Sequence, residues 1–416
     1  MLKSWSIKNF KPILDSGELQ LKPVTILAGR NSSGKSSLIQ SILMVAQTLS
    51  NPLPERALLP NERIVQLGTY NDVLCEFSGS KDITLKFGLY CEPEDIGQND
   101  IDLYRASHHN LEAIFTSTAN IDTGIAAIET SKVTVDHIRL DFTLEYYEPD
   151  DSSELVGEIR ANRSTERTFL GELTLHNGGI NTTEIYGLEL FHFLPSDLIK
   201  RSEKDTGSAN VNTGNRVMSD IIKRIDEEQA FNSIKSYFSD TAQDITRFFT
   251  SKIRYLGSLR PDPGATQRSF APTSQLDDVG FKGEYAAVTY YYNQLAQIDW
   301  YNPYTGQVER ETLKNILDAW VRYLEIANEV TTEEAGGLGV AWKVVIKEGQ
   351  KARTLPEVGG GVNHLLPILV MGLLSPKNTL LIIEEPEVTL HPSVQARLGD
   401  FFMGLAKCGK QCLIET

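Results

Sequence analysis

The first fifty residues show three short strand patterns followed by a helical one. Apolar and polar residues alternate, or apolar residues cluster, in residues 2–10, 19–21 and 24–28, which predicts strands. A helical pattern covers residues 35–50 and is stopped by the two prolines that follow. The start of the chain therefore predicts a strand, a loop and a helix in immediate succession around residue 30.

Strand-like patterns dominate the middle of the chain. Alternation or β-branched content predicts strands at 83–90, 133–146, 154–161, 169–175 and 184–193. The polar, poorly patterned residues 95–130 are expected to form a surface insertion with one or two helices. In residues 217–250, apolar residues recur at helical spacing, which predicts a pair of amphipathic helices that pack on the core.

The last third of the chain mixes both patterns. Strands are expected at 253–257, 340–347, 380–385 and 411–416, and helices at 283–329 and 365–374. The run 380–385 is continuously apolar until its two final carboxylates, as in a buried strand of a parallel sheet.

These patterns predict an α/β fold with β-rich and helical insertions. We expect four regions: an N-terminal lobe (1–90), a β-rich and helical insertion (91–250), a helical middle region (251–339) and a C-terminal lobe (340–416). The first and last regions are expected to build the core sheet.

A phosphate-binding loop stands between the strand at 24–28 and the helix that follows. Residues 29–36 match the pattern G-x-x-x-x-G-K-[ST] at every fixed position. The amides of such a loop and of the next helix N-terminus bind phosphate. Lys35 is expected to reach the β- and γ-phosphates, and the Ser36 hydroxyl to hold Mg²⁺. The expected nucleotide-binding residues are Gly29, Arg30, Asn31, Ser32, Ser33, Gly34, Lys35, Ser36 and Ser37.

Two adjacent carboxylates end the apolar run at 380–385. Ligands collect at the carboxyl ends of the strands in α/β sheets, which is where Glu384 and Glu385 are expected. Glu384 is expected to hold Mg²⁺ or its water shell, since hard cations prefer oxygen ligands. Glu385 is expected to be the catalytic base that activates the water attacking the γ-phosphate.

Three consecutive glycines lie just before the helical run at 365–374. Gly359, Gly360 and Gly361 would let a phosphate approach the backbone at a helix start. The chain already has one phosphate-binding loop, so we interpret this segment, with Asn363, as covering the ATP of another subunit in a dimer. The alternative is a flexible loop before a helix.

Composition excludes several classes of protein. The 416 residues are 41% hydrophobic and 23% charged, which is ordinary for a globular protein of two or three domains. The net charge of −15 argues against nucleic-acid binding over the whole surface, although a local patch stays possible. Four scattered cysteines indicate neither a disulfide framework nor a zinc site. With no membrane-length apolar run and no signal-peptide core, we expect a cytoplasmic protein without a membrane partner.

The motifs together resemble an ABC-type ATPase head of the group that includes SMC-like and OLD-like proteins. Bacterial AAA-type ATPases of this group are found in anti-phage defence systems. The resemblance rests on Ile7-Lys8-Asn9-Phe10, the loop at 29–36, the glycine segment and the string E-E-P-E-V-T-L-H-P at 384–392. It implies a P-loop NTPase fold with ATP and Mg²⁺ as cofactors. It also implies that Gln66 is a Q-loop glutamine at the nucleotide and the metal, and that residues 359–364 are a signature loop acting across the dimer.

The sequence departs from the family pattern at two places. Asn363-His364 stands where Ser-Gln would be typical, and Glu384 stands where aspartate is more common. The family also continues beyond the equivalent of Thr416 with a switch histidine. Either this chain is a fragment of a longer protein, which we favour, or its ATP hydrolysis is slow.

The resemblance implies a sensor or regulatory ATPase that forms a homodimer, or a higher homo-oligomer, through its ATP sites. Its setting would be a bacterial anti-phage defence or DNA-processing complex with a separate, nuclease-like effector protein, and DNA is a possible further partner. One alternative is a nucleotide-gated scaffold with little turnover that assembles an effector. A second is an SMC-like DNA-repair ATPase, although the chain lacks a long heptad repeat.

Overall fold

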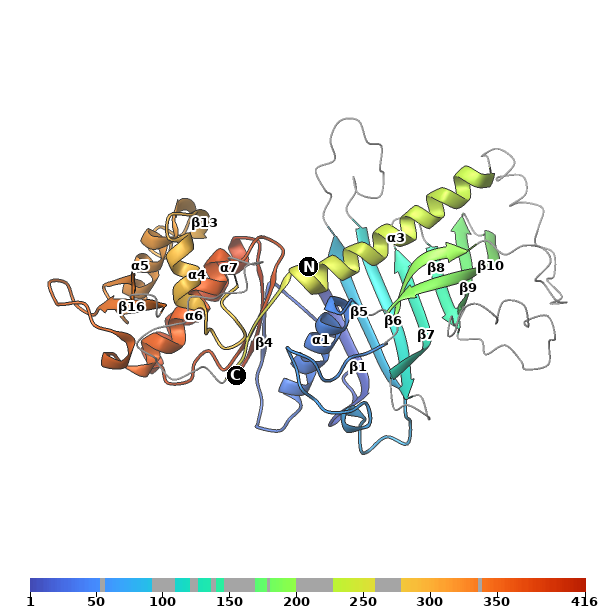
Figure 1. The fold of residues 1–416 in the computed structure, drawn as a ribbon, viewed down its shortest axis with the longest axis horizontal. Helices are drawn as coiled ribbons and strands as arrows, with labels where there is room; N and C mark the ends of the chain where they lie inside the picture. The colour runs from blue at the N-terminus through green and yellow to red at the C-terminus, as the bar shows by residue number, and fades with distance from the viewer. Residues whose placement is uncertain are drawn as a thin grey trace. The chain divides into compact units, whose positions relative to one another are not determined.

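The computed structural model describes residues 1–52, 57–91, 109–119, 126–135, 140–145, 169–177, 180–199, 227–258, 278–335 and 339–416. The chain forms two compact units (Figure 1). The first comprises Met1, Leu21–Ile39 and Lys252–Thr416, and the second comprises Leu2–Gln20 and Gln40–Ser251. Among the described residues, no helix combines the length and the apolar character needed to cross a membrane.

A four-stranded parallel sheet is the framework of the first unit. Its order is β12 (Ile253–Leu256), β17 (Leu380–Glu384), β18 (Gln411–Glu415) and β4 (Val24–Leu27). The two inner strands are buried along almost their whole length, which explains their unbroken apolar sequences. β4 lies at the edge with one neighbouring strand, and its Ile26 is 60% exposed.

Helices surround this sheet within the first unit. They are α4 (Ala286–Asn293), α5 (Leu313–Tyr323), α6 (Gly360–Leu374) and α7 (Pro392–Lys407). Trp320 of α5 packs edge-on against Phe401 of α7, with ring centroids 5.0 Å apart. The buried Lys410 Nζ donates to two carbonyl oxygens in the last turn of α6, those of Gly372 and Leu373, which helps to satisfy the helix end. Burial lowers the pKa of Lys410 to about 8.

Two antiparallel hairpins complete the first unit. β13 (Gln297–Tyr301) pairs with β14 (Val308–Thr312), and β15 (Glu329–Glu334) pairs with β16 (Val340–Val345). The continuous helix expected over 283–329 was therefore wrong, because a hairpin separates α4 from α5. The turn between β13 and β14 contains Pro303 and a left-handed Gly306 (φ 74°), both of which oppose a helix.

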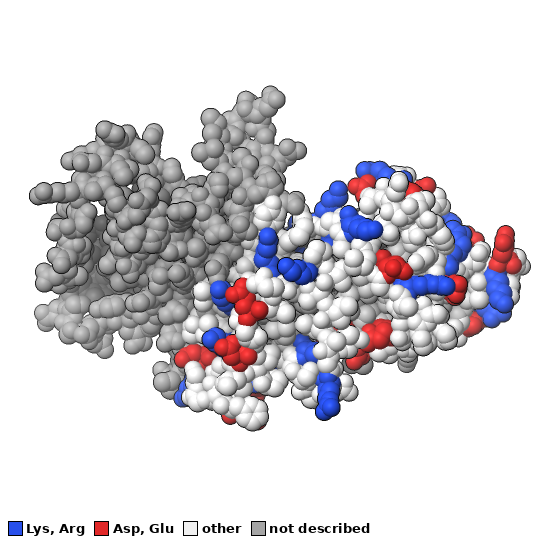
Figure 2. Space-filling view, turned by 180° about the vertical axis from the view of Figure 1, so that it is seen from behind, with Lys and Arg blue, Asp and Glu red and all other residues white. Residues whose placement is uncertain are grey.

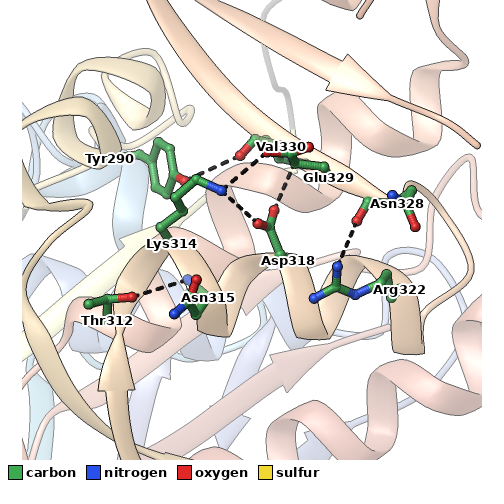
Figure 3. A network of polar contacts seen from close by, with 9 residues as sticks. All are labelled: Tyr290, Thr312, Lys314, Asn315, Asp318, Arg322, Asn328, Glu329 and Val330. Atoms are coloured by element: carbon green, nitrogen blue, oxygen red, sulfur yellow. Dashed lines mark hydrogen bonds and ion pairs between the residues drawn. The ribbon is translucent and has the colours of Figure 1, made fainter. Parts of the chain in front are cut away.

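A polar network fixes α5 to the second hairpin (Figure 3). The buried Asp318 accepts a hydrogen bond from the Val330 backbone amide at 2.9 Å. Lys314 Nζ lies 3.0 Å from Asp318 Oδ2 and 3.2 Å from Glu329 Oε1, so the buried carboxylate has a cationic partner. The network explains how an aspartate is accommodated on the buried side of this helix.

The second unit is dominated by a ten-stranded antiparallel sheet of order β11-β10-β9-β8-β7-β6-β5-β1-β2, with β3 also paired to β1. Its strands are β1 (Leu2–Phe10), β2 (Ile13–Asp15), β3 (Leu19–Gln20), β5 (Ile83–Cys91), β6 (His109–Ala119), β7 (Ala126–Val135), β8 (Leu140–Glu145), β9 (Phe169–Asn177), β10 (Ile180–Phe191) and β11 (Leu194–Ile199). The long helix α3 (Glu227–Ser251) contacts β11.

The structure revises the expectations for the middle of the chain. The segment at 95–130 contributes β6 and part of β7, not helices, to the described residues. The helical pattern at 217–250 yields the single helix α3 from residue 227, and residues 217–226 lie outside the described residues. The strand expected at 154–161 also lies outside them.

An aromatic cluster forms part of the core of the second unit. Trp5 of β1 stacks on Phe87 of β5, with ring centroids 5.8 Å apart, and Phe249 of α3 contacts both rings. Trp5 Nε1 donates to the Ser41 hydroxyl at 2.9 Å, and Ser41 belongs to α1 (Lys35–Ser50). These contacts explain why the first strand of the chain, expected in the core sheet of the ATPase lobes, joins the second unit: β1 pairs along its length with β5.

Candidate functional site

The phosphate-binding loop joins β4 to α1, as the sequence predicts. Gly34 adopts φ 93°, a left-handed conformation that glycine reaches without strain. α1 begins directly after it at Lys35. The first-turn amides of a helix have no partner inside the helix, so they are available to an anion seated in the loop.

Lys35 and Ser36 have defined partners at this loop. Lys35 Nζ donates to the carbonyl oxygens of Gly29 at 2.7 Å and Arg30 at 3.2 Å, so the ammonium group lies over the loop. The Ser36 hydroxyl donates to Oε1 of Glu415 at 2.7 Å. The Ser36 hydroxyl therefore meets the end of β18, and ligands of α/β sheets bind at such strand ends.

The carboxylate of Glu384 ends β17 next to this point. Its Oε1 accepts from the Tyr255 hydroxyl at 3.1 Å, and its Oε2 accepts from the Ser258 backbone amide at 3.3 Å. Across the strands, Glu384 is the register partner of Glu415. Two acidic residues thus lie side by side at the carboxyl ends of the two inner strands, near Ser36.

Burial and neighbouring carboxylates raise the pKa of Glu384. Burial is the largest cause, and Glu415 is the next. The hydrogen bonds from Ser258 and Tyr255 oppose the rise by stabilising the charged form. Burial and Glu384 in turn raise the pKa of the Tyr255 hydroxyl well above its usual range, so it stays a proton donor.

Glu385, the expected catalytic base, is exposed, and hydrogen bonds to its backbone groups fix its position. Its φ of 45° is left-handed, an unusual conformation for a residue with a side chain. Its amide donates to the Glu415 carbonyl oxygen at 2.8 Å, and its carbonyl oxygen lies 3.1 Å from Nε2 of the buried His364. Strained residues that their surroundings hold in place concentrate at functional sites.

The glycine segment is the start of a helix and not the flexible loop of the alternative. α6 begins at Gly360, earlier than the expected residue 365, and Gly359 is its N-cap. Gly359 and Gly360 are exposed, and a Cβ atom added to either would meet no atom within 4 Å. Asn363 and His364 lie in the first turns of the helix. Sequence reasoning missed the contact of His364 with the Glu385 backbone.

Gln66 lies in the second unit, whereas the phosphate-binding loop and both acids lie in the first. It is exposed and forms an antiparallel bridge with Asn61. The preceding residue, Val65, is anchored to α1, because its amide donates to Gln47 Oε1 at 2.9 Å. The Q-loop role of Gln66 at nucleotide and metal stays a prediction.

The donors at the strand ends fit a hard divalent cation. The described residues contain no group of three or more His, Cys, Asp or Glu side chains that would bind a metal by themselves. Mg²⁺ is usually bound by one or two carboxylates together with substrate phosphates, and Ser36 and Glu384 supply such oxygens. Oε2 of Glu415 is buried there without a hydrogen-bond partner among the described residues.

Comparisons with known proteins identify a family for the chain. Residues 24–416 match the family model described as "AAA domain, putative AbiEii toxin, Type IV TA system". None of the curated proteins matches. Two similar solved structures are SMC heads: the "SMC head domain from Thermotoga maritima" (11% identity, 100% of this chain and 88% of that chain covered, TM-score 0.33) and the Smc head domain from Pyrococcus furiosus bound to the C-terminal domain of ScpA (12%, 100% and 89%, 0.35).

The family match covers the phosphate-binding loop and both acids, and the structure carries them on one parallel sheet. The expected α/β fold of a P-loop NTPase is confirmed. The chain belongs to the AAA domain family that includes putative AbiEii toxins, a family of nucleotide-binding ATPases.

Proposed function

We propose that the protein hydrolyses ATP as a dimer whose two subunits close around the nucleotide. The observation that carries the proposal is that Lys35 and Ser36 begin α1 and the Ser36 hydroxyl reaches Glu415, the register partner of Glu384, with Glu385 directly after Glu384. These are the positioning, metal-binding and base functions that phosphoryl transfer requires.

Each side chain has a distinct task in the proposed reaction. Lys35 leaves the loop carbonyls and binds the β- and γ-phosphates of ATP. Glu385 accepts a proton from a water molecule whose oxygen attacks the γ-phosphorus, and the bond from that phosphorus to the bridging oxygen of ADP breaks. Mg²⁺, held by Ser36 and Glu384, would neutralise charge on the phosphate oxygens.

The glycine segment supports a dimer. Neither Gly359 nor Gly360 has a left-handed φ, and a side chain at either position would occupy open space within the chain. The fold of one subunit therefore does not require glycine at these positions. Close approach of a phosphate from a second subunit does require it, and the N-terminus of α6 adds favourable partial charge.

Mixing two inactive variants tests this arrangement. Lys35→Ala removes the phosphate lysine, and Gly360→Glu blocks the glycine segment; each homodimer should be inactive. A mixed dimer has one complete site, made of the phosphate loop from the Gly360→Glu subunit and the glycine segment from the Lys35→Ala subunit. We therefore expect each dimer that contains one subunit of each variant to release phosphate at up to about half the rate of a wild-type dimer.

The matched control mixes Lys35→Ala with Glu385→Gln. Both changes fall in the part of the site that one subunit supplies, so each of the two sites in that mixed dimer stays incomplete, and no activity should return. No recovery with Gly360→Glu would show that the segment acts within its own subunit, contradicting the dimer. If wild type forms ATP-dependent dimers without releasing phosphate, the protein is a nucleotide-gated scaffold instead.

His364 is expected to position Glu385 through the backbone. His364→Ala removes the hydrogen bond to the Glu385 carbonyl oxygen and should lower kcat about tenfold, with little change in KM, because the base loses its orientation and not its substrate contacts. His364→Gln keeps a side-chain donor and should recover most of the rate. Equal kcat in the wild type and in His364→Ala would refute the positioning role.

The biological setting is proposed from the family and from the resemblance. We infer a cytoplasmic sensor or regulatory ATPase in a bacterial anti-phage defence or DNA-processing system, which acts on a separate, nuclease-like effector protein. The family description names a putative toxin of a type IV toxin–antitoxin system. Figure 2 shows Lys and Arg interspersed with Asp and Glu over the described part of one face, which gives DNA less support than a protein partner.

A further inference from the structure

Glu415 stands at the centre of the strand ends, although no motif assigns it a role. It is the last residue of β18, between β17 and β4, and its register partners are Glu384 on one side and Leu27 on the other. Leu27 ends the strand that leads into the phosphate loop. The parallel strands therefore place Glu415 between the loop and the metal-binding acid.

The two oxygens of the Glu415 carboxylate differ in their partners. Oε1 accepts the hydrogen bond from the Ser36 hydroxyl at 2.7 Å. Oε2 is buried and has no partner among the described residues, and the residue as a whole is only 7% exposed. Buried carboxylate oxygens are normally hydrogen-bonded or bound to a cation, so an unpaired one at a ligand site indicates a ligand.

The neighbouring acid strengthens this indication. Glu384 and Glu415 lie directly opposite each other on adjacent strands, an arrangement that is destabilising for like charges. A divalent cation between them would turn the repulsion into attraction, and hydroxyl and carboxylate oxygens are its preferred donors. Together with Ser36, these side chains supply one hydroxyl and two carboxylates beside the phosphate loop.

We propose that Glu415 is the second carboxylate of the divalent-cation site. In the nucleotide-free protein it holds the Ser36 hydroxyl in place, and with nucleotide it shares the cation with Ser36 and Glu384, directly or through a bound water. The inference rests on the proposed nucleotide-binding function and adds to it a residue that sets metal affinity.

Binding of the fluorescent ATP analogue MANT-ATP, measured with Mg²⁺ and with EDTA, tests the role without relying on hydrolysis. Wild type should bind more tightly with Mg²⁺. Glu415→Gln keeps an acceptor for Ser36 but loses the charge, so its affinity in EDTA should stay within about twofold of wild type while the gain from Mg²⁺ falls about tenfold or more. Glu348→Gln, which changes an exposed carboxylate of the same unit, should match wild type in both media.

Two results would overturn the proposal: an unchanged Mg²⁺ gain in Glu415→Gln, or an equal loss of affinity in both media, which would mean that Glu415 only shapes the loop. Glu415→Asp retains the charge, so it should recover part of the affinity gain from Mg²⁺ that Glu415→Gln loses. A gain as large as that of wild type in both variants would contradict the role. Wild type that binds no MANT-ATP in either medium would refute the proposed function itself, and this inference with it.

Discussion

Glu385→Gln is expected to stop ATP hydrolysis while leaving ATP bound. The amide keeps the size of the side chain but does not accept the proton of the attacking water, and general bases contribute about 10²- to 10⁴-fold to rate. The phosphate loop and Ser36 are untouched, so binding should persist. A subunit that binds ATP without cleaving it should remain closed on its partner.

The measurement is steady-state phosphate release together with the mass of the complex in ATP and Mg²⁺, by light scattering after gel filtration. We expect a rate at least about 100-fold below wild type and a stable dimer only in ATP. The variant preserves the left-handed backbone, since glutamine and glutamate have similar conformational preferences, so its unfolding temperature should match wild type. Normal turnover in Glu385→Gln would refute the base assignment.

Lys35→Ala is expected to weaken nucleotide binding strongly. The ammonium group has two carbonyl partners in the loop, and both are exchanged for charged phosphate oxygens when ATP binds. Hydrogen bonds between charged groups contribute up to about 3 kcal/mol each, so losing the contact should weaken ATP binding about 100-fold.

Titration with MANT-ATP measures this loss directly. Lys351→Ala, which removes an exposed lysine of the same unit, is the matched control and should bind like wild type. The Lys35 side chain is not part of the buried core, so circular dichroism and thermal unfolding should be unchanged. ATP affinity equal to wild type in Lys35→Ala would mean that residues 29–36 are an ordinary turn.

The parts of the fold that the sequence predicts well are those with a local signal. The strand before the phosphate loop, α1, β17 and β18 lie where their apolar runs and the flanking turn residues indicate. The hairpin β13–β14 was missed because its apolar spacing also fits a helix, and only the Pro303–Gly306 turn distinguishes the two. The assignment of β1 to the second unit depends on its pairing with β5, which is distant in the chain, and no local pattern reveals that pairing.

The candidate site shows the same division between local and distant information. The phosphate loop and Glu384-Glu385 carry motifs, so they were found. Glu415 carries none, yet a signal existed: the run at 411–415 ends in an acid just as the run at 380–384 does, and adjacent parallel strands bring such ends together. The His364 contact with the Glu385 backbone involves a main-chain oxygen, for which a sequence has no marker.

The open space at Gly359 and Gly360 means that a side chain at these positions would affect activity without affecting folding. A side chain there leaves the folding of the subunit almost untouched, so variants would accumulate in the cell at normal abundance while failing to pair productively. In the proposed dimer, a variant subunit paired with a normal one would still form one complete site, from its own phosphate loop and the normal glycine segment. Loss of function at these glycines would therefore be partial wherever normal subunits are present. An assay of protein level would not detect it, whereas loss through the buried core removes the protein itself.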